Sequence, residues 1–598
     1  MPENILIAIA WPYANAEIHV GNITGSHLPG DIVARYHRLK GNKVLMVSGT
    51  DSHGTPVTIR ADAEGKPVEA VYKFFHDTFV DVFKGYGITY DLFTSTHTEN
   101  HFKVSQAIFL ALKQNGYLYT EIRPQWYSPA AAKFLPDRYV EGTCYLCGFE
   151  GARSDQCDQC GNVLDPEKLV NPRSKIDNST PELRDTEHYF LDLSKLESKV
   201  ADFLRARQSY WRETVSGQSL GQIESDGLKP RPITRDLDWG IPVPEAGWES
   251  KRIYVWFEAV IGYLSAAIEW SKVSGSGEAW REWWTNPEAK SFYFIGKDNI
   301  FFHAAWWPAQ LMGAGSAFMK IFAEEEAPLT LPYDVPANQF MNLEGAKISG
   351  SRNWAVWGRD ALARYDPDAL RYYLTVNMPE AKDSDWAWDE FVARNNGELV
   401  ATWGNLANRV LSFAFKHWDG HVPQVDLAQL RESDLSLLAA IEDGFKSVGG
   451  YYETVKLRDA LRESLRLATE VNRYLDANAP WTAIKTDRDS AALTIYTALK
   501  AIDSLKVLFS PVLPFTSEKL HTFFNYDTPL FGEQFTETVE DALGTHTVLR
   551  YKPANDVLSL QWQPSALQPG QPLQQPGPLF KKLDDKLVVP DELARLGH

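Results

Sequence analysis

Cysteine is scarce in this chain. Only four cysteines occur among 598 residues, and all of them lie between positions 144 and 160. This scarcity excludes a disulfide framework that spans the chain. Clustering of this kind in an intracellular protein is more typical of a metal site than of disulfides.

Long apolar runs and a basic leader are also missing. No segment reaches the roughly 18 to 20 apolar residues that cross a bilayer, so we expect no membrane partner. The N-terminus has no basic stretch and no small-residue cleavage site, which argues against a secretory signal and predicts a cytoplasmic protein. The net charge is -18, from 60 Lys and Arg against 78 Asp and Glu. That balance excludes a generally basic nucleic-acid coat but leaves room for a local basic track.

Core-forming residues are abundant, with 44% hydrophobic and 13% aromatic residues. A chain of this length is too long to fold around a single hydrophobic core, so we expect several domains. The apolar "NILIAIA" (residues 4–10) is typical of a central parallel strand. We expect this strand to be followed by a helix over residues 20–40, a strand in "NKVLMVSGTDSHGTP" and an amphipathic helix in "PVEAVYKFFHDTFVDVF". This alternation predicts an α/β fold with a doubly wound parallel, Rossmann-like sheet, in which ligands lie beyond the carboxyl ends of the strands.

The alternation stops near residue 117, resumes near 233 and gives way to helices near 390. We therefore predict a Rossmann-like domain in two halves, an inserted subdomain, a helical bundle and a tail. The predicted divisions are 1–116 for the first half, 117–232 for the insertion, 233–330 for the second half, 331–388 for a connecting region, 389–515 for the bundle and 516–598 for the tail.

The cysteines follow the pattern C-x2-C-x9-C-x2-C, with a glycine after each pair. Two residues between thiolates let both sulfurs converge on one ion, and four sulfurs complete a tetrahedron with no open position. We therefore predict one structural Zn²⁺ held by Cys144, Cys147, Cys157 and Cys160. Free or disulfide-bonded thiols are the alternative.

Two polar segments are candidates for binding phosphate. His19, Gly21 and Asn22 fall where the first strand gives way to the first helix, and a helix N-terminus favours anions. Gly21 has no Cβ, so a flat base can lie against the backbone. The loop "EGAKISGSRNW" (344–354) is rich in small residues and carries Lys347 and Arg352, as expected of a loop that closes over a polyphosphate. Either segment alone is equally consistent with an ordinary turn.

Together, these segments resemble a known family. "HVGN" and "KISGS" are similar to the HIGH and KMSKS elements of class I aminoacyl-tRNA synthetases. "AWPYANAEIHVGN", "SGTDSHGTP", "YVWFEAVIGY", "FIGKDNIFFH" and the four-cysteine knuckle resemble the methionyl-tRNA synthetase family, from about residue 4 to 515. The resemblance implies ATP-dependent ligation of L-methionine to its tRNA through methionyl-adenylate, with release of AMP and pyrophosphate. It also implies that residues 331–388 contact the tRNA stem.

The resemblance assigns roles to individual residues. His19, Gly21, Asn22, Lys347, Ser349 and Ser351 are expected to bind ATP, which enters with Mg²⁺. Two departures from the family pattern stand out, because Asn22 replaces the second histidine and Gly350 replaces the second lysine. We hypothesise that Arg352 supplies the missing charge, since a guanidinium can bind phosphate through two hydrogen bonds.

The resemblance also implies an aromatic-walled methionine pocket with a carboxylate for the ammonium group. Asp51 is the expected carboxylate. The expected wall residues are Trp11, Tyr13, Trp256, Ala259, Tyr263 and His303. Val260 stands where the family often has proline, which is expected to slacken that wall.

The helical half offers a combination suited to unstacked RNA bases. Asn405 and Arg409 are four residues apart on one helix face, and Trp481 follows a proline at a helix start. From the residues alone, a buried polar network with Trp481 as filler is the simpler interpretation. The resemblance instead implies that these three residues read the CAU anticodon, with Arg394, Asn395 and Asn396 near the RNA backbone.

Other functions compete with this interpretation. A synthetase for leucine, isoleucine or valine would be expected to carry a larger insertion, and one for cysteine an active-site metal. A small-molecule nucleotidyltransferase has no use for the helical bundle, and a non-catalytic RNA-binding scaffold would not consume ATP. We found no match to the C-terminal dimerising domain of some relatives and expect a monomer.

Overall fold

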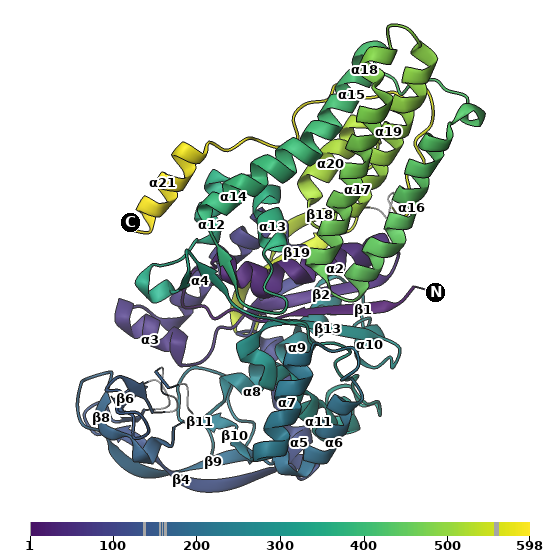
Figure 1. Ribbon diagram of the computed structural model, residues 1–598. Coiled ribbons are helices and arrows are strands. Elements are labelled where there is room, and N and C mark those ends of the chain that lie inside the picture. Colours follow the sequence, from purple (N-terminus) through teal and green to yellow (C-terminus); the bar gives the residue numbers. More distant parts are fainter. Residues whose placement is uncertain are drawn as a thin grey trace.

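The computed structural model describes residues 2–135, 139–154, 157, 159–160, 164–554 and 561–597, apart from the side chain of Ser351. Its centre is a seven-stranded sheet in the order β14-β13-β1-β2-β3-β19-β18 (Figure 1). The strands are β14 (Ala337–Asn338), β13 (Lys290–Gly296), β1 (Asn4–Ile9), β2 (Lys43–Thr50), β3 (Leu92–Ser95), β19 (Gly544–Lys552) and β18 (Glu533–Asp541). The first five are parallel, and the last two join antiparallel. The predicted doubly wound α/β fold is confirmed.

Strand β1 shows why the sheet is buried on both faces. Its side chains alternate between two cores: Ile5, Ile7 and Ile9 enter one, and Leu6 and Ala8 enter the other. The first face is covered by α2 (Leu28–Leu39) and α4 (Val68–Gly85), and the second by α5 (Glu99–Gln114), α9 (Gly262–Val273) and α11 (Trp307–Ala323). Shorter helices lie near the sheet edges: α1 (Val20–Asn22), α3 (Thr55–Glu64), α8 (Val255–Ala259) and α10 (Arg281–Trp284).

The insertion is a long antiparallel ribbon with a small lobe at its end (Figure 1). Strands β4 (Leu118–Ser128) and β9 (Glu182–Leu191) form the ribbon. The remaining elements are β5 (Lys133–Phe134), β6 (Val140–Thr143), β7 (Ala152–Arg153), β8 (Val170–Ser174), α6 (Glu197–Arg205), α7 (Glu213–Asp226), β10 (Arg231–Pro232), β11 (Thr234–Arg235) and β12 (Arg252–Ile253). Helices α6 and α7 pack into the second sheet core, whereas the cysteine lobe has only a small core of its own.

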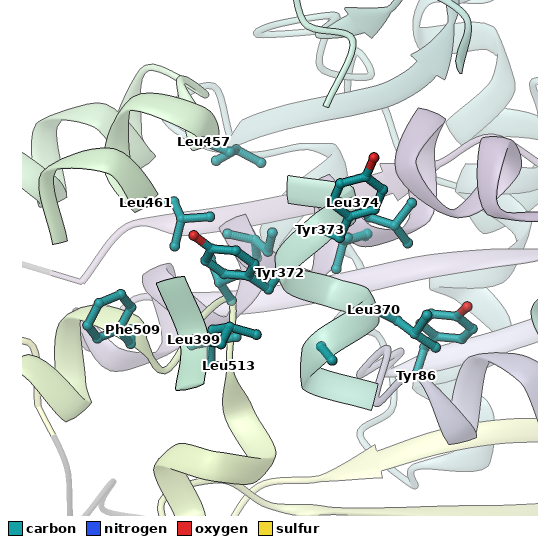
Figure 2. Packing of buried hydrophobic residues seen from close by; sticks show 14 of the residues in the cluster. Tyr86, Leu370, Tyr372, Tyr373, Leu374, Leu399, Leu457, Leu461, Phe509 and Leu513 are labelled. Carbon is teal, nitrogen blue, oxygen red and sulfur yellow. The ribbon is translucent and has the colours of Figure 1, made fainter. Parts of the chain in front are cut away.

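The helical half is joined to the sheet domain by one continuous core. Helix α13 lies at the centre of this junction, with Leu370, Tyr372 and Leu374 packed between the sheet helices and Leu457, Leu461 and Phe509 of the bundle (Figure 2). The connecting region contains β15 (Met341–Leu343), β16 (Ala346–Lys347), α12 (Gly358–Arg364), α13 (Pro367–Val376) and β17 (Ser384–Trp386). The bundle contains α14 (Trp388–Arg394), α15 (Asn405–His417), α16 (Glu432–Glu453), α17 (Leu457–Asn478), α18 (Pro480–Ala483), α19 (Arg488–Phe509) and α20 (Pro514–Phe523).

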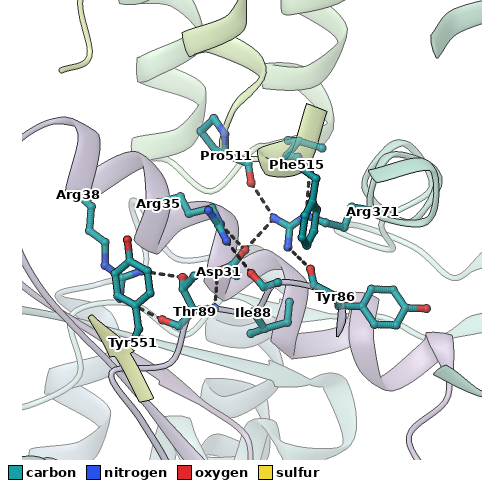
Figure 3. A network of polar contacts seen from close by, with 12 residues as sticks. Asp31, Arg35, Arg38, Tyr86, Ile88, Thr89, Arg371, Pro511, Phe515 and Tyr551 are labelled. Atoms are coloured by element: carbon teal, nitrogen blue, oxygen red, sulfur yellow. Dashed lines mark hydrogen bonds and ion pairs between the residues drawn. The ribbon is translucent and has the colours of Figure 1, made fainter. Parts of the chain in front are cut away.

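A buried ion-pair network crosses the same junction (Figure 3). Asp31 of α2 accepts hydrogen bonds from Arg35 at 2.9 Å and from Arg371 of α13 at 2.7 Å. Arg371 also donates to the carbonyl oxygens of Tyr86, after α4, and of the adjacent Pro511 and Val512, after α19. Burial raises the pKa of Asp31, but the two guanidinium groups outweigh it and hold the pKa at about 2. The network therefore fixes α2, α13 and the end of α19 in one arrangement.

The C-terminal segment packs back across both halves. Strand β19 pairs with β3, so the tail extends the sheet built by the N-terminal half. Helix α21 (Asp585–Arg595) then lies against α14 and α12, with the buried Glu592 accepting from Arg364 at 2.6 Å. Within the described residues, every helix is too short or too polar to traverse a lipid bilayer.

Candidate active site and RNA-binding surface

One cavity of about 650 Å³ opens at the carboxyl ends of β1, β2 and β13. Most of the residues predicted from sequence to bind ATP or the amino acid line it: Trp11, Tyr13, His19, Gly21, Asn22, Asp51, Trp256, Ala259, Tyr263, His303 and Lys347. Ser349 and Arg352 are not among the lining residues, and the side chain of Ser351 lies outside the described part of the chain. Segments more than 300 residues apart thus meet at one edge of the sheet.

His19 begins the helical run from Val20 to Leu39. The Nδ1 atom of His19 accepts from the backbone N–H of Asn22 at 3.3 Å, and the Asn22 side chain accepts from the backbone N–H of His19 at 3.1 Å. Burial lowers the pKa of His19 to about 4, so its ring is neutral at pH 7. Because Nδ1 accepts a hydrogen bond, the proton of the neutral ring is on Nε2, which makes Nε2–H a donor.

Close approach of two side chains favours glycine at position 21. A Cβ atom there would lie 3.0 Å from the His19 ring and 3.3 Å from Ile348. The contact with Ile348 brings the polar loop directly over the start of the helix.

The polar loop is held at both ends. Its first arm is β16, which pairs with β15, and its second arm pairs with the segment before the first helix. There, Val20 N–H donates to Val356 O at 3.0 Å and Gly358 N–H donates to Ile18 O at 2.8 Å. Lys347 is exposed at the tip of the first arm. The loop is thus anchored to the same strand end that presents His19.

The apolar end of the cavity is shaped by glycines around Trp11. A Cβ atom on Gly49 would lie 2.2 Å from the Trp11 ring, and one on Gly262 would lie 2.7 Å away. Trp256 stacks on Phe302 with ring centroids 4.2 Å apart and meets Tyr13 edge-on at 6.1 Å. These contacts give a rigid aromatic wall, the kind of surface that a thioether contacts favourably.

Tyr263 and His303 form a buried pair in this wall. The Tyr263 hydroxyl lies 2.6 Å from His303 Nε2, and His303 Nδ1 lies 2.9 Å from the carbonyl oxygen of Asn299. Burial lowers the pKa of His303 to about 4, so the ring is neutral. A carbonyl oxygen can only accept, so Nδ1 carries the proton and Nε2 accepts from the tyrosine. The tyrosine oxygen therefore keeps its lone pairs for a ligand.

Asp51 lies at the end of β2 with only 3% of its surface exposed. Burial and the nearby carboxylate of Glu258 raise its pKa well above the ordinary value, opposed by a 3.3 Å hydrogen bond from His53 N–H. Glu258 in turn lies 2.7 Å from His53 Nδ1 and 2.6 Å from His101 Nε2. A ligand ammonium would relieve the repulsion between these carboxylates. Asp51 is thus suited to binding a cation.

Sequence reasoning missed this support behind Asp51. His53 and Glu258 stand inside the quoted "SGTDSHGTP" and "YVWFEAVIGY" segments, and their polarity within apolar surroundings was the available signal. His101 lies in an ordinary helix pattern and gave none. Asp298 and Phe340 also line the cavity without having been predicted.

The four cysteines converge as a metal site requires. Their sulfur atoms all lie within 4.8 Å of one another, and those of Cys147 and Cys157 are 3.6 Å apart. Four sulfurs at about 2.3 Å from a tetrahedral Zn²⁺ would be about 3.8 Å apart, so the donor set fits this ion. The Leu146 N–H points at the Cys144 sulfur, 3.4 Å away, and helps to orient that ligand.

The exposed end of the bundle gathers the three predicted RNA-binding residues. Asn405 and Arg409 are both exposed and line a cavity of about 310 Å³. The Arg409 guanidinium lies 4.8 Å from the centre of the half-buried Trp481 ring. These side chains therefore form a surface rather than a buried network.

Arg394, Asn395 and Asn396 are engaged within the protein. Arg394 pairs with Glu390 at 2.9 Å and with Glu398 at 3.0 Å. The amide groups of Asn395 and Asn396 donate to the carbonyl oxygens of Lys581 and Leu583, at 3.0 and 2.8 Å. The side chains of Asn395 and Asn396 thus hold the C-terminal segment in place.

Comparisons with known proteins agree with this geometry. The family model described as "tRNA synthetases class I (M)" matches residues 5–411, and "Anticodon binding domain of methionyl tRNA ligase" matches residues 422–551. Methionine--tRNA ligase of Thermomicrobium roseum is 50% identical over 596 residues, covering 100% of this chain and 99% of the relative. That of Roseiflexus sp. is 49% identical over 604 residues, with coverage of 100% and 99%.

The fold is shared with solved structures. Mycobacterium tuberculosis methionyl-tRNA synthetase bound by methionyl-adenylate has a TM-score of 0.73 and 24% identity, covering 97% of this chain and 100% of that one. The family matches span the cavity, the polar loop and most of the bundle. The chain therefore belongs to the methionyl-tRNA synthetase family of class I aminoacyl-tRNA synthetases.

Proposed function

We propose that the cavity at the sheet edge is the place where this enzyme activates L-methionine with ATP before charging its tRNA. The supporting observation is that the HIGH-like strand end, the KMSKS-like loop and the aromatic pocket around Asp51 all line one cavity. As a methionine–tRNA ligase, the enzyme joins methionine to tRNA through methionyl-adenylate and releases AMP and pyrophosphate.

Methionine is proposed to lie at the aromatic end of the cavity. Its thioether would contact Trp11, Tyr13, Trp256 and Ala259, and sulfur–aromatic contacts contribute about 0.3–1.5 kcal/mol each. Its ammonium group would pair with Asp51. The Tyr263–His303 pair would accept no second proton at pH 7, so it presents a neutral wall to a neutral side chain.

ATP is proposed to lie between His19 and the polar loop. The Nε2–H of His19, the Asn22 side chain and the helix N-terminus would bind phosphate oxygens, and the adenine would lie over Gly21. Lys347 would bind the β- and γ-phosphates, with Ser349 and Ser351 beside it and Arg352 as the second cation of the loop. Mg²⁺ bound with ATP would add positive charge on the same phosphate oxygens.

The chemistry proposed here needs position and charge rather than a protein nucleophile. A methionine carboxylate oxygen attacks the α-phosphorus, and the bond between that phosphorus and the bridging oxygen of pyrophosphate breaks. A ribose hydroxyl of the tRNA then attacks the carbonyl carbon of the adenylate, and AMP leaves. Asp51, His19 and Lys347 act by holding the two substrates in line.

We further propose that Cys144, Cys147, Cys157 and Cys160 hold one structural Zn²⁺. All four positions of the tetrahedron would be filled by thiolates, so the ion would stabilise the small lobe and would not touch substrate. The lobe has few apolar residues of its own, which makes a metal staple physically reasonable.

The bundle end is proposed to read the CAU anticodon. Trp481 offers a stacking face for an unpaired base, and Asn405 and Arg409 offer hydrogen bonds to base edges. The exposure of Asn405 and Arg409 supports this proposal.

Two assays test these assignments. ATP–pyrophosphate exchange with each of the twenty amino acids should proceed with methionine above all others. Trp481→Ala should raise the KM for tRNA strongly and leave methionine-dependent exchange nearly intact, since the bundle end is separate from the cavity. Arg462→Ala, an exposed arginine on α17 that pairs with Asp459, serves as the matched control. Equal loss in both assays for Trp481→Ala would contradict the separation of the two sites.

A further inference from the structure

The phosphate end of the cavity is short of positive charge. Among the described residues that line the whole cavity, Lys347 is the only lysine or arginine, while Glu17 and Asp298, as well as Asp51 at the methionine end, are acidic. His19 and His303 are neutral, because burial lowers the pKa of each to about 4. A triphosphate carries several negative charges, and one ammonium group in an acidic cavity is a poor match for it.

A second ammonium group contacts the same aromatic ring as that of Lys347. Lys297, directly after β13, has its Nζ atom 4.3 Å from the centre of the Phe340 ring, and the Nζ atom of Lys347 lies 5.5 Å from the same centre. The two nitrogens are therefore within about 10 Å of each other, both within cation–π range of one ring. Phe340 itself lines the cavity, so the ring separates Lys297 from the substrate space by a single side chain.

A second, smaller cavity leads to the same point. It has a volume of about 550 Å³ and is lined by Lys297 together with Asp298, Gln339 and Phe340. The last three residues also line the main cavity. Lys297 thus lies where the two cavities share lining residues, and its flexible four-carbon side chain has the freedom to turn toward the larger one.

Lys297 is held there by a bond that is easily exchanged. Its ammonium group lies 2.7 Å from Asp383, with 29% of the lysine side chain and 45% of the aspartate side chain exposed. Exposed pairs of this kind contribute little to stability, so a polyphosphate competes well for the lysine. The hydrogen bond from Lys297 lowers the pKa of Asp383, and the charge of Lys347 lowers it further, which shows that both cations act on one small region.

We infer that Lys297 leaves Asp383 when ATP binds and supplies a further cation on the β- and γ-phosphates, in addition to the cations of the polar loop. The lysine acts by its positive charge on the departing pyrophosphate. This inference rests on the proposed placement of ATP. It places an additional charge at the end of β13, next to a loop that has Gly350 where the family has a lysine.

The test compares Lys297→Met, Lys297→Arg and Asp383→Asn in methionine-dependent ATP–pyrophosphate exchange. Loss of one charge-assisted hydrogen bond predicts that Lys297→Met lowers kcat/KM for ATP by about 10- to 100-fold. It should weaken pyrophosphate binding in the reverse reaction by a similar factor and leave methionine affinity within about twofold, because methionine does not contact the β- and γ-phosphates. Lys297→Arg keeps the charge and should recover most of the activity.

Asp383→Asn is the matched control for a structural role. It removes the negative charge of the pair but keeps the Oδ1 atom, which accepts from Lys297 Nζ at 2.7 Å and from Phe340 N–H at 2.9 Å, so activity should stay within about twofold of the parent. Equal losses in Asp383→Asn and Lys297→Met would overturn the inference, as would a parent-like Lys297→Met enzyme. If Arg352→Ala lowered kcat/KM for ATP and weakened pyrophosphate binding while Lys297→Met did not, the charge would be assigned to Arg352 instead. Absence of methionine-dependent exchange in the parent enzyme would contradict the proposed function itself, and the two failures are thereby distinguished.

Discussion

Replacing Asp51 with asparagine should weaken methionine activation and, at the same time, stabilise the fold. The substitution keeps the shape of the side chain and removes its charge. A hydrogen bond between charged partners contributes about 1.5–3 kcal/mol, which corresponds to a loss of about 10- to 150-fold in kcat/KM for methionine. The KM for ATP should change little, because the phosphates lie at the other end of the cavity.

The stability effect has the opposite sign for a reason visible in the structure. Burial and Glu258 raise the pKa of Asp51 well above its ordinary value. An aspartate whose pKa is raised on folding releases its proton more readily when unfolded, so stability is lost as pH rises above the unfolded pKa. Asp51→Asn avoids this cost. Its melting temperature should exceed that of the parent at pH 8, and the difference should shrink toward pH 5.

The assay is ATP–pyrophosphate exchange with methionine varied at saturating ATP, paired with thermal melts at both pH values. In the parent, the KM for methionine should rise as pH falls, because Asp51 becomes protonated. This dependence should be absent in Asp51→Asn. Asp81→Asn, which removes a carboxylate that is 73% exposed, is the control and should change neither quantity. A methionine kcat/KM within twofold of the parent for Asp51→Asn would refute the role assigned to this carboxylate.

Two further predictions concern the scaffold. Arg371→Met should lower the free energy of unfolding by about 3–5 kcal/mol in denaturant melts, because Asp31 loses one of its two guanidinium partners while it stays buried. Arg359→Met, at an exposed arginine, is the control. A change below about 1 kcal/mol for Arg371→Met would contradict the role of the network. Cys157→Ser should abolish stoichiometric zinc in elemental analysis and lower the melting temperature of the insertion. Ser154→Ala, which changes a buried residue that is not one of the four thiolates, should retain the metal. Full zinc content in Cys157→Ser would rule out the four-thiolate site.

The features that the sequence predicted well are those with local causes. The apolar β1 segment, the helix from Val20 and the cysteine spacing each follow from neighbouring residues, and the structure confirms the strand, the helix and the convergence of the four sulfurs. Asp51 was identified as the carboxylate of the amino-acid pocket through the resemblance of its segment, "SGTDSHGTP", to the family. Its role in binding stays a prediction, although its position in the cavity agrees with it.

The features that the sequence did not reveal depend on contacts between distant segments. His101 reaches Glu258 across 157 residues, and Lys297 lies near Lys347 only because both side chains extend to the ring of Phe340, which belongs to a third segment. The hydrogen bonds from Asn395 and Asn396 to the C-terminal tail could not be predicted either, because nothing in their own segment indicates the partner. Periodicity reports which face of an element is buried, not what buries it.

The pairing of β19 with β3 has a consequence for biosynthesis. The sheet that carries the proposed active site is not complete until Lys552 has left the ribosome, although its first strand ends at Ile9. Until then β3 has an open edge, and strands of this kind can pair with other chains during synthesis. Nascent chains of intermediate length are therefore expected to depend on chaperones more than the finished protein does.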